Sequence, residues 1–297
     1  MIAMARASRS KNSKKHYPVQ RKMMLATALP ASPDTTFLIR TDKLLSNVNH
    51  RLYRQSRVYN VKVDIDADLP DGATVKVYAL ADTWYNMKAY QLAKKTFDES
   101  SAEEREQLGT HNARWNDFRV DTGESDAVEL QAKQIATGIA DGRFIGGEYE
   151  FTEVVDAAGT SNTLRWAGSG ANTYNIIDEY DLTANTSSAP SAIISSVAYD
   201  GLSDELDDLQ TAHLSNDGNR PPYDENTLEN QCWVYIGTLY IRGSGTNKLS
   251  TGFFNAPCGL VRLATSGGLE ANSLSDNVCI EVKGGDYKGV HAPSYLE

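Results

Sequence analysis

The sequence predicts a mainly β fold in which short antiparallel strands form a sandwich, with a basic segment before it and helical insertions within it. Apolar and polar residues alternate with a period of two near both ends of the expected domain, which is typical of half-buried strands. The helical patterns are grouped together and do not alternate with the strands, which argues against a parallel doubly wound sheet. Positive charge is concentrated in the first 62 residues.

The charge distribution divides the 297 residues into two unlike parts. Residues 1–62 hold 13 of the 29 Lys and Arg residues and 2 of the 39 Asp and Glu residues, so their net charge is +11 and that of the remainder is −21. Such an asymmetry is typical of a basic tail that binds a polyanion, attached to an acidic body. Residues 1–22 are rich in Ser, Lys and Arg and are expected to be a disordered arm. Residues 23–56 are expected to be a linker that lines the same inward-facing surface as the arm.

The first strands are expected at the start of a folded domain that spans residues 57–297. In "RVYNVKVDIDADL" the apolar residues Val61, Val63 and Ile65 alternate with polar residues, which predicts a half-buried strand. "PDGA" is typical of a turn and "TVKVYALA" of a second strand, so together they predict a hairpin.

A helical insertion is predicted near residues 84–140. "WYNMKAYQLAKKTFDES" and "SAEEREQLGTHNARWNDF" have helical patterns, and Ser101 followed by Glu104 matches a capping box. "SDAVELQAKQIATGIA" predicts a third helix. The aromatic residues of this insertion could pack it onto the sandwich or form a contact between subunits; they are Trp84, Tyr85, Tyr90, Trp115 and Phe118.

Strand patterns return after residue 143, with further insertions expected near residues 156–172 and 201–230. Four short patterns are followed by an acidic helix and a Pro-rich loop, and the chain ends with the clearest strand signals. These segments are "FIGGEYEFTEVVDA", "NTLRWAG", "TYNIIDEYDLTA", "SAIISSVAYDG", "SDELDDLQTAHL", "SNDGNRPPYDENT", "CWVYIGTLYIRG", "STGFFNAPCGLVRLAT" and "NVCIEVKG". Eight or nine short strands, without the paired cysteines and central Trp of an immunoglobulin domain, predict a single antiparallel eight-stranded jelly roll.

The cysteines and the apolar runs indicate the cellular environment in which the protein is made. Cys232, Cys258 and Cys279 are far apart and lack metal-ligand spacing, so they are expected to be buried free thiols. The longest apolar run near the N-terminus, "MMLATAL", is too short to span a membrane and lacks the features of a secretory signal. We expect a protein that is synthesised inside the cell and does not insert into a membrane.

Seven cations in residues 1–22 predict binding to a polyanion through counterion release, which needs dense positive charge but no defined geometry. Against single-stranded nucleic acid they would give a slope of log K against log salt of roughly −5. Contacts with phosphates carry no sequence information, so little discrimination between bases is expected from the arm. The arm could instead be a solubilising tail or a nuclear localisation signal, and "KKHYPVQRK" is compatible with both targeting and packaging.

Three carboxylates at alternate positions could hold a metal ion. On a strand, Asp64, Asp66 and Asp68 would project from one face, where they could bind calcium together with a neighbouring subunit, or they could form an ordinary solvated face. No other cofactor is expected. The five histidines are scattered, and no nucleophile elbow, zinc motif or P-loop is present, so the sequence predicts no enzyme.

The arm "RASRSKNSKKHYPVQRK", the strand "RVYNVKVDID" and the ending "CWVYIGTLYIRGSGTNKLSTGFFNAPCGLVRL" together resemble the jelly-roll capsid proteins of small icosahedral viruses with single-stranded genomes. The resemblance is closest to circular single-stranded DNA viruses, and it concerns architecture over nearly the whole chain. It implies self-assembly into an icosahedral shell, a virion location, packaging of single-stranded viral nucleic acid by the arm, and an outer surface that meets a host receptor of unknown identity. The residues that would contact nucleic acid are Arg6, Arg9, Lys11, Lys14, Lys15, Arg21 and Lys22, with Arg40, Arg51 and Arg54 beside them.

Two other classes of protein remain open at this point. A non-viral β-sandwich module that binds carbohydrate or a cell surface could carry a basic tail, although such an adhesin would be expected to have a secretory signal. A cellular nucleic-acid-binding protein is also conceivable, but the acidic body offers no basic face. A capsid protein should sediment as a very large particle, whereas the other two should not.

Overall fold

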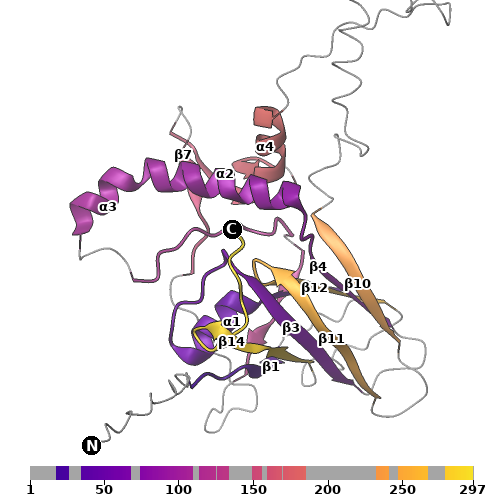
Figure 1. Cartoon of the computed structure of the whole chain (residues 1–297). Helices are drawn as coiled ribbons and strands as arrows, with labels where there is room; N and C mark the ends of the chain where they lie inside the picture. The colour runs from indigo at the N-terminus through magenta and orange to yellow at the C-terminus, as the bar shows by residue number, and fades with distance from the viewer. Residues whose placement is uncertain are drawn as a thin grey trace, which may run out of the picture.

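The computed structural model confirms that the protein is mainly β. The residues that it describes are 18–26, 35–67, 74–109, 114–124, 126–133, 149–155, 159–168, 170–184, 232–240, 247–266 and 278–296. A sandwich of two sheets forms the lower part of the view in Figure 1, and helices α2, α3 and α4 lie above it.

Eight strands build the two main sheets, and two short strands extend them at one edge. One sheet has the order β11-β3-β13-β1-β6 and the other has the order β10-β4-β12-β2-β5. All pairs except β2–β5 are antiparallel. The strands are β1 (Lys22–Ala26), β2 (Thr36–Arg40), β3 (Val58–Ala67), β4 (Thr74–Leu80), β5 (Val128–Glu129), β6 (Gln131–Ala132), β10 (Trp233–Tyr240), β11 (Asn247–Pro257), β12 (Leu260–Ser266) and β13 (Val278–Val282).

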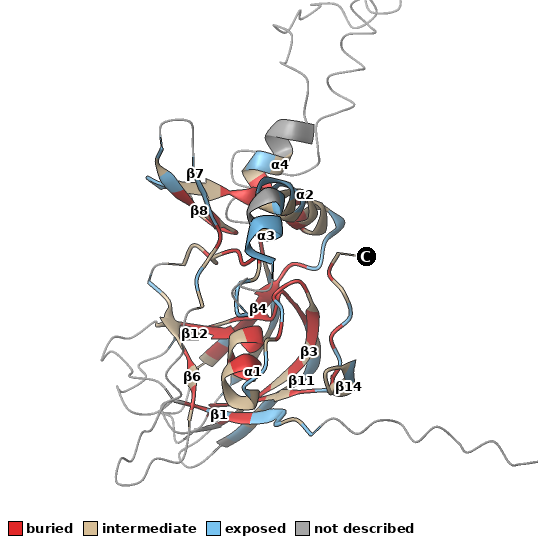
Figure 2. Cartoon of the chain, turned by 90° about the vertical axis from the view of Figure 1, so that its left-hand side faces the viewer, coloured by how far each residue is buried: buried red, intermediate tan, exposed pale blue. Residues whose placement is uncertain are grey.

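The main hydrophobic core lies between these two sheets. The period of two in the sequence places every second side chain of a strand in this core. Val61, Val63 and Ile65 of β3 are at most 1% exposed, and Val75 and Val77 of β4 are fully buried. Figure 2 shows the buried residues on strands of both sheets. The alternation seen in the sequence is therefore confirmed as a pattern of half-buried strands.

The segment expected to be a linker, residues 23–56, contributes core structure. Strand β1 pairs with β13 on one side and with β6 on the other, and its Met23 and Leu25 are buried. Strand β2 pairs with β12 and runs into helix α1 (Thr41–Asn49), whose Leu44 and Leu45 are buried. The expectation of a linker was wrong because each apolar stretch is short, and the strands that pair with it lie at least 91 residues away in sequence.

The hairpin predicted between residues 57 and 81 does not form. Both strands exist, but β3 pairs with β11 and β13, whereas β4 pairs with β10 and β12 in the opposite sheet. The chain therefore crosses from one sheet to the other between them. Both strands bury apolar residues in the same core, which the alternation alone cannot distinguish from a hairpin.

A single excursion of the chain between β4 and β10 contains the helices α2 and α4 and a third sheet. Its ends lie side by side, because Ala81 N donates to Cys232 O at 2.7 Å. The insertions expected near 84–140 and 156–172 belong to this one excursion wherever they are described, except that the chain returns to the sandwich at β5 and β6. Residues 201–230 lie outside the described part. The elements are α2 (Trp84–Ser100), α3 (Ala102–Leu108), β7 (Glu153–Val155), β8 (Ser161–Arg165), β9 (Thr173–Asn175) and α4 (Ile176–Ala184), and the sheet has the order β7-β8-β9.

The first predicted helix is confirmed at its expected bounds, and the others are changed. The helix expected over 101–118 ends at Leu108, and the hydroxyl of Ser101 donates to the Phe97 carbonyl at 2.6 Å, so it does not cap α3. The described part of 125–140 forms β5 and β6 in place of a helix, with Leu130 and Ala132 buried at alternate positions. The strand expected over 173–184 ends after three residues and continues as α4. The segments 191–201 and 203–214 lie outside the described residues.

A second core joins the excursion to the end of the sandwich. Trp166 and Tyr90 are fully buried with their rings stacked at 5.8 Å, and Tyr90 also meets Phe118 at 5.2 Å. Tyr295, from the C-terminal segment that follows β14 (Gly284–Tyr287), packs on Tyr90 at 5.6 Å. The aromatic residues Tyr90 and Phe118 thus pack the insertion onto the sandwich, as one of the two alternatives expected.

Candidate nucleic-acid interface

The arm leaves the fold at the end of helix α1. Gln20 N donates to the Asn49 side-chain oxygen at 2.7 Å, and the Asn49 amide donates back to Gln20 O at 3.1 Å. Arg21 is exposed, its carbonyl accepts from Val282 N at 2.9 Å, and its side chain lies against Gly284. Of the seven predicted arm cations, Arg21 and Lys22 are therefore held at the start of β1. The other five lie outside the described residues: Arg6, Arg9, Lys11, Lys14 and Lys15.

A group of four cations lies close to this exit, and we call it the basic cluster: Arg51, Arg54, Arg57 and Lys288. Two predicted residues, Arg51 and Arg54, follow directly after α1 and are exposed. Lys288, from the turn after β14, donates to the Leu52 carbonyl and so links this turn to the segment that follows α1. Nothing in the sequence indicated that Arg57 and Lys288 belong to one site, because they are separated by 231 positions.

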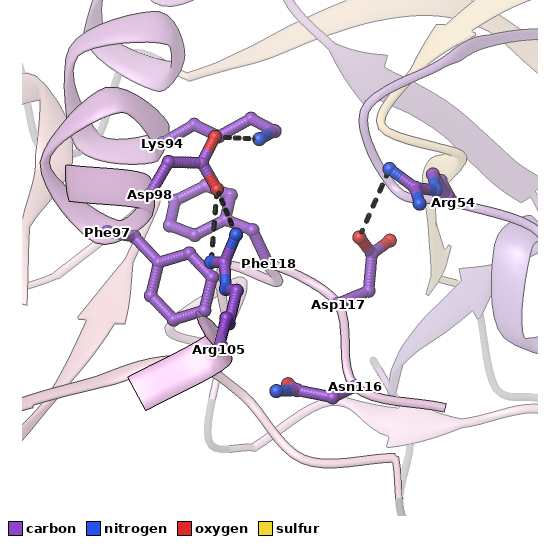
Figure 3. A pocket seen from close by; sticks show the side chains of 8 residues that line it. All are labelled: Arg54, Lys94, Phe97, Asp98, Arg105, Asn116, Asp117 and Phe118. Atoms are coloured by element: carbon purple, nitrogen blue, oxygen red, sulfur yellow. Dashed lines mark hydrogen bonds and ion pairs between the residues drawn. The ribbon is translucent and has the colours of Figure 1, made fainter. Parts of the chain in front are cut away.

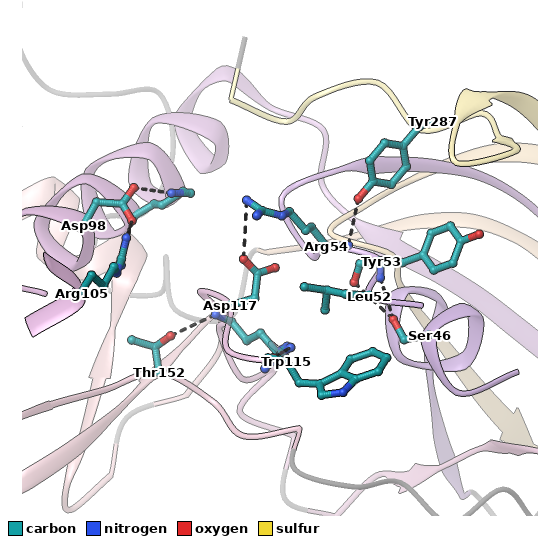
Figure 4. Close-up of polar contacts among 12 residues, drawn as sticks. Ser46, Leu52, Tyr53, Arg54, Asp98, Arg105, Trp115, Asp117, Thr152 and Tyr287 are labelled. Carbon is teal, nitrogen blue, oxygen red and sulfur yellow. Dashed lines mark hydrogen bonds and ion pairs between the residues drawn. The ribbon is translucent and has the colours of Figure 1, made fainter. Parts of the chain in front are cut away.

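Tyrosine rings contact two cations of the basic cluster, Arg57 and Lys288. The Arg57 guanidinium lies 4.3 Å from the centroid of the Tyr287 ring, and the Lys288 ammonium lies 5.3 Å from the same centroid. The Tyr287 hydroxyl accepts from Arg54 N at 3.2 Å, as Figure 4 shows. Such contacts stabilise a cation but leave its charge uncompensated.

The electrostatics of the basic cluster favour an anionic ligand. Burial lowers the pKa of Lys288, and the neighbouring charges of Arg51, Arg54 and Arg57 lower it further. A lowered pKa means that the charged form is disfavoured at this place. A phosphate group beside Lys288 would favour its charged form and so oppose this shift.

Arg40, another predicted contact, does not share this surface. It is only 3% exposed, and its guanidinium lies 4.1 Å from the centroid of the Phe151 ring. The neighbouring Asp42 is fully buried and accepts a hydrogen bond from the Tyr149 hydroxyl. Burial raises the pKa of Asp42, while Arg40 and Tyr149 lower it. Arg40 therefore belongs to a buried polar group that connects β2 and α1 to residues 149–151.

A pocket of about 310 Å³ opens on the other side of Arg54. Figure 3 shows it between the segment that carries Arg54 and the helices α2 and α3 of the excursion. Phe97 and Phe118 supply apolar walls, and Asn116 and Asp117 supply polar groups. The Asp117 carboxylate lies 4.0 Å from the Arg54 guanidinium.

Asp117 is an unusual carboxylate because much of it is buried. Its side chain is 9% exposed, and its second carboxylate oxygen is buried without a hydrogen-bond partner. Burial raises the pKa of Asp117, while Arg54 and Arg119 lower it. A hydrogen-bond donor placed beside this oxygen would relieve the cost of its desolvation.

A second pocket of about 550 Å³ adjoins the first and shares Phe97, Asn116 and Asp117 with it. Trp115 and Arg114 line its mouth, and Trp115 is 38% exposed. Figure 4 shows Trp115 and Asp117 on the excursion side and Arg54 on the facing segment. We call the two adjoining pockets the cleft. Sequence reasoning noted Trp115 only as an aromatic of the insertion, and no spacing pattern pointed to Asn116 or Asp117.

The acidic strand face gives no metal site within the described residues. Asp64 accepts from Lys62 at 3.1 Å, and Lys62 also pairs with Glu281 at 3.0 Å. The side chain of Asp66, and all of Asp68, lie outside the described part. Among the side chains that are described, no three His, Cys, Asp or Glu residues are grouped as metal ligands would be.

The three cysteines are free and buried, as expected. Among the described helices, none is long and apolar enough to cross a membrane.

Comparison with known proteins identifies no relative, so the functional argument rests on the geometry described above. No family model, curated protein or solved structure matches the chain.

Proposed function

We propose that this protein is a jelly-roll capsid protein that assembles into a closed shell and packages single-stranded nucleic acid through its basic arm. The strand order supports the jelly roll. Leaving out the short edge strands, the two sheets have the orders β11-β3-β13-β1 and β10-β4-β12-β2. Every connection except the one from β4 to β10 crosses between the sheets, and the excursion is inserted at that exception. Two four-stranded sheets linked in this way are typical of a double Greek key.

The observation that carries the proposal is the position of the basic cluster at the root of the arm. Gln20 is held by Asn49, and Arg51 follows two residues later. The arm and the basic cluster therefore present positive charge from one place on a chain whose net charge is −10. A polyanion is attracted to this place and repelled by the acidic remainder, which fixes the orientation of each subunit around a genome.

Removal of the arm tests the proposal. Because Lys22 begins β1, the deletion should stop at residue 17 and leave residues 18–22 to support that strand. The full chain and the deleted chain are compared by electron microscopy and by the amount of nuclease-protected nucleic acid per subunit. A full-length chain in which Arg6, Arg9, Lys11, Lys14 and Lys15 are replaced by Gln is the matched control, since it removes charge without changing length.

We expect uniform shells that retain nucleic acid only when the arm cations are present. Small oligomers of every variant, over a range of salt and calcium concentrations, would contradict the proposal. That result would favour a non-viral β-sandwich binding module.

A further inference from the structure

We infer that the cleft is a binding site for a base of single-stranded nucleic acid, with cytosine preferred to thymine. The inference rests on the proposed function, because it takes the packaged strand as the ligand. It goes beyond that function in assigning base recognition to a cleft in the excursion, where the arm alone would contact only phosphates.

The cleft is continuous with the basic cluster through one residue. Arg54 belongs to the basic cluster and also lines the first pocket. A strand whose phosphates lie on Arg51, Arg57 and Lys288 would therefore pass the mouth of the cleft. The volumes of about 310 and 550 Å³ lie within the range of small-molecule sites, roughly 300–1,000 Å³.

An aromatic surface is available for stacking at the mouth. Trp115 is 38% exposed, and its neighbours Arg114 and Asn116 are exposed as well. Stacking of bases on exposed aromatic rings is the main sequence-tolerant contact of single-stranded binding proteins. Trp115 can supply this contact for a base that enters from the basic cluster.

Two residues of the cleft supply hydrogen-bonding groups, Asn116 and Asp117. The buried oxygen of Asp117 has no hydrogen-bond partner, and the Asn116 amide offers both a donor and an acceptor. A carboxylate accepts well from the amino group of cytosine, whereas thymine presents a carbonyl oxygen at that position. Asp117 lines both pockets of the cleft, and the Arg54 guanidinium lies 4.0 Å from its other carboxylate oxygen.

Binding of short oligonucleotides to the full chain tests this inference. Octamers of deoxycytidine and of deoxythymidine are titrated at about 0.5 M salt, where exposed charges are largely screened and stacking remains. The variants are Trp115→Ala and Asp117→Asn. The matched control is Trp84→Ala, which removes an equally large and more exposed aromatic side chain (65%) at the start of α2. Unchanged circular dichroism and melting temperature establish that each variant is folded.

We expect the wild-type chain to bind the deoxycytidine octamer more tightly than the deoxythymidine octamer. Trp115→Ala should weaken binding of both by about 5- to 150-fold, which is the range that one stacked base supports. Asp117→Asn should remove the preference between the two octamers, and Trp84→Ala should change nothing. Equal affinities of wild type and Trp115→Ala, or an equal loss in Trp84→Ala, would overturn the inference, and a preference that survives in Asp117→Asn would overturn the role of Asp117.

This test is separable from the test of the capsid. If shells retain nucleic acid and Trp115→Ala binds like the wild type, base recognition fails while the proposed function stands. If no shell forms but Trp115→Ala weakens binding, the cleft is supported and the proposed function fails.

Discussion

Gly259 shows how one residue fixes the turn that carries the chain from β11 to β12, across the sandwich. Its φ angle is +70°, and its carbonyl accepts from Thr41 N at 2.8 Å. A Cβ atom at this position would lie 3.1 Å from Asp42 N and 3.1 Å from Tyr59 Cδ2. Glycine is needed here both for the backbone conformation and for the close approach of α1.

Replacement of Gly259 by Ala is therefore expected to destabilise the fold by more than the left-handed conformation alone costs, which is about 1–2 kcal/mol. Gly252→Ala is the matched control, because Gly252 has a φ angle of +71° and no atom within 4 Å of its added Cβ. Urea unfolding of both variants measures the difference. Equal losses of unfolding free energy would show that crowding at Gly259 has no effect.

The cysteines allow a second prediction at this scale. Burial raises the pKa of Cys232 to about 12, and it raises the pKa of Cys258 and Cys279 as well. The reactive thiolate is therefore scarce at pH 8. A colorimetric thiol reagent should find no fast-reacting group in the folded protein and three after denaturation. A fast-reacting thiol in the folded state would place at least one cysteine at the surface.

Local charge density in the sequence did not indicate which of the predicted cations are exposed and which are buried. Arg40 and Arg51 look alike in the sequence, yet Arg40 is 3% exposed and Arg51 is exposed. One signal in the sequence distinguished Arg40 from Arg51. Asp42 is one of only two acidic residues in the first 62, and it lies two positions after Arg40. An isolated acid beside an arginine indicates a local counter-ion. The role of Asp117 depends on its contact with Arg54, 63 positions earlier, which no local pattern reveals.

At the scale of elements, helix α2 begins with a cap that the sequence analysis overlooked. The side chain of Thr83 accepts from Asn86 N at 3.2 Å and satisfies one of the free amides of the first turn. Thr83→Ala should lower the free energy of unfolding by about 1 kcal/mol.

Thr96→Ala in the same helix is the control for this cap. The Thr96 hydroxyl donates to the Leu92 carbonyl within the helix, and Ala has the higher helix propensity, so this change should be neutral or slightly stabilising. Chemical denaturation followed by circular dichroism compares the two variants. An equal loss in both would mean that the hydrogen bond to Asn86 N does not matter.

Strands and helices with a strong internal period were predicted well, whereas the pairing of the strands was not. β3, β4 and α2 lie where the sequence indicated. The hairpin between β3 and β4 was wrong because strand pairing depends on residues far away in the chain. The short strands β1 and β2 were missed for the same reason, since five-residue stretches become strands only through their neighbours in the sheet.

At the scale of the whole molecule, the separation of charge predicts that the proposed binding of single-stranded nucleic acid depends strongly on salt. Removal of residues 1–17 takes away five cations. Each cation that neutralises a phosphate of a single strand contributes about −0.7 to the slope of log K against log salt. The deletion should therefore reduce the magnitude of the slope by roughly 3.5.

Fluorescence anisotropy with a labelled single-stranded oligonucleotide at several salt concentrations measures this slope. The slope that remains after the deletion should fall further when Arg51 and Arg57 are replaced by Gln, because these residues belong to the basic cluster. An unchanged slope in the deleted chain would mean that the arm does not contact the phosphates.

The position of β1 has a mechanical consequence. The arm continues directly into a strand that is paired on both sides, with four residues opposite β13 and two opposite β6. A pull in the direction of β1 loads these hydrogen bonds in shear, so they must break together and not one after another. Tension on a nucleic acid bound to the arm would thus be transmitted into the sandwich through β1, which lies between β13 and the short edge strand β6.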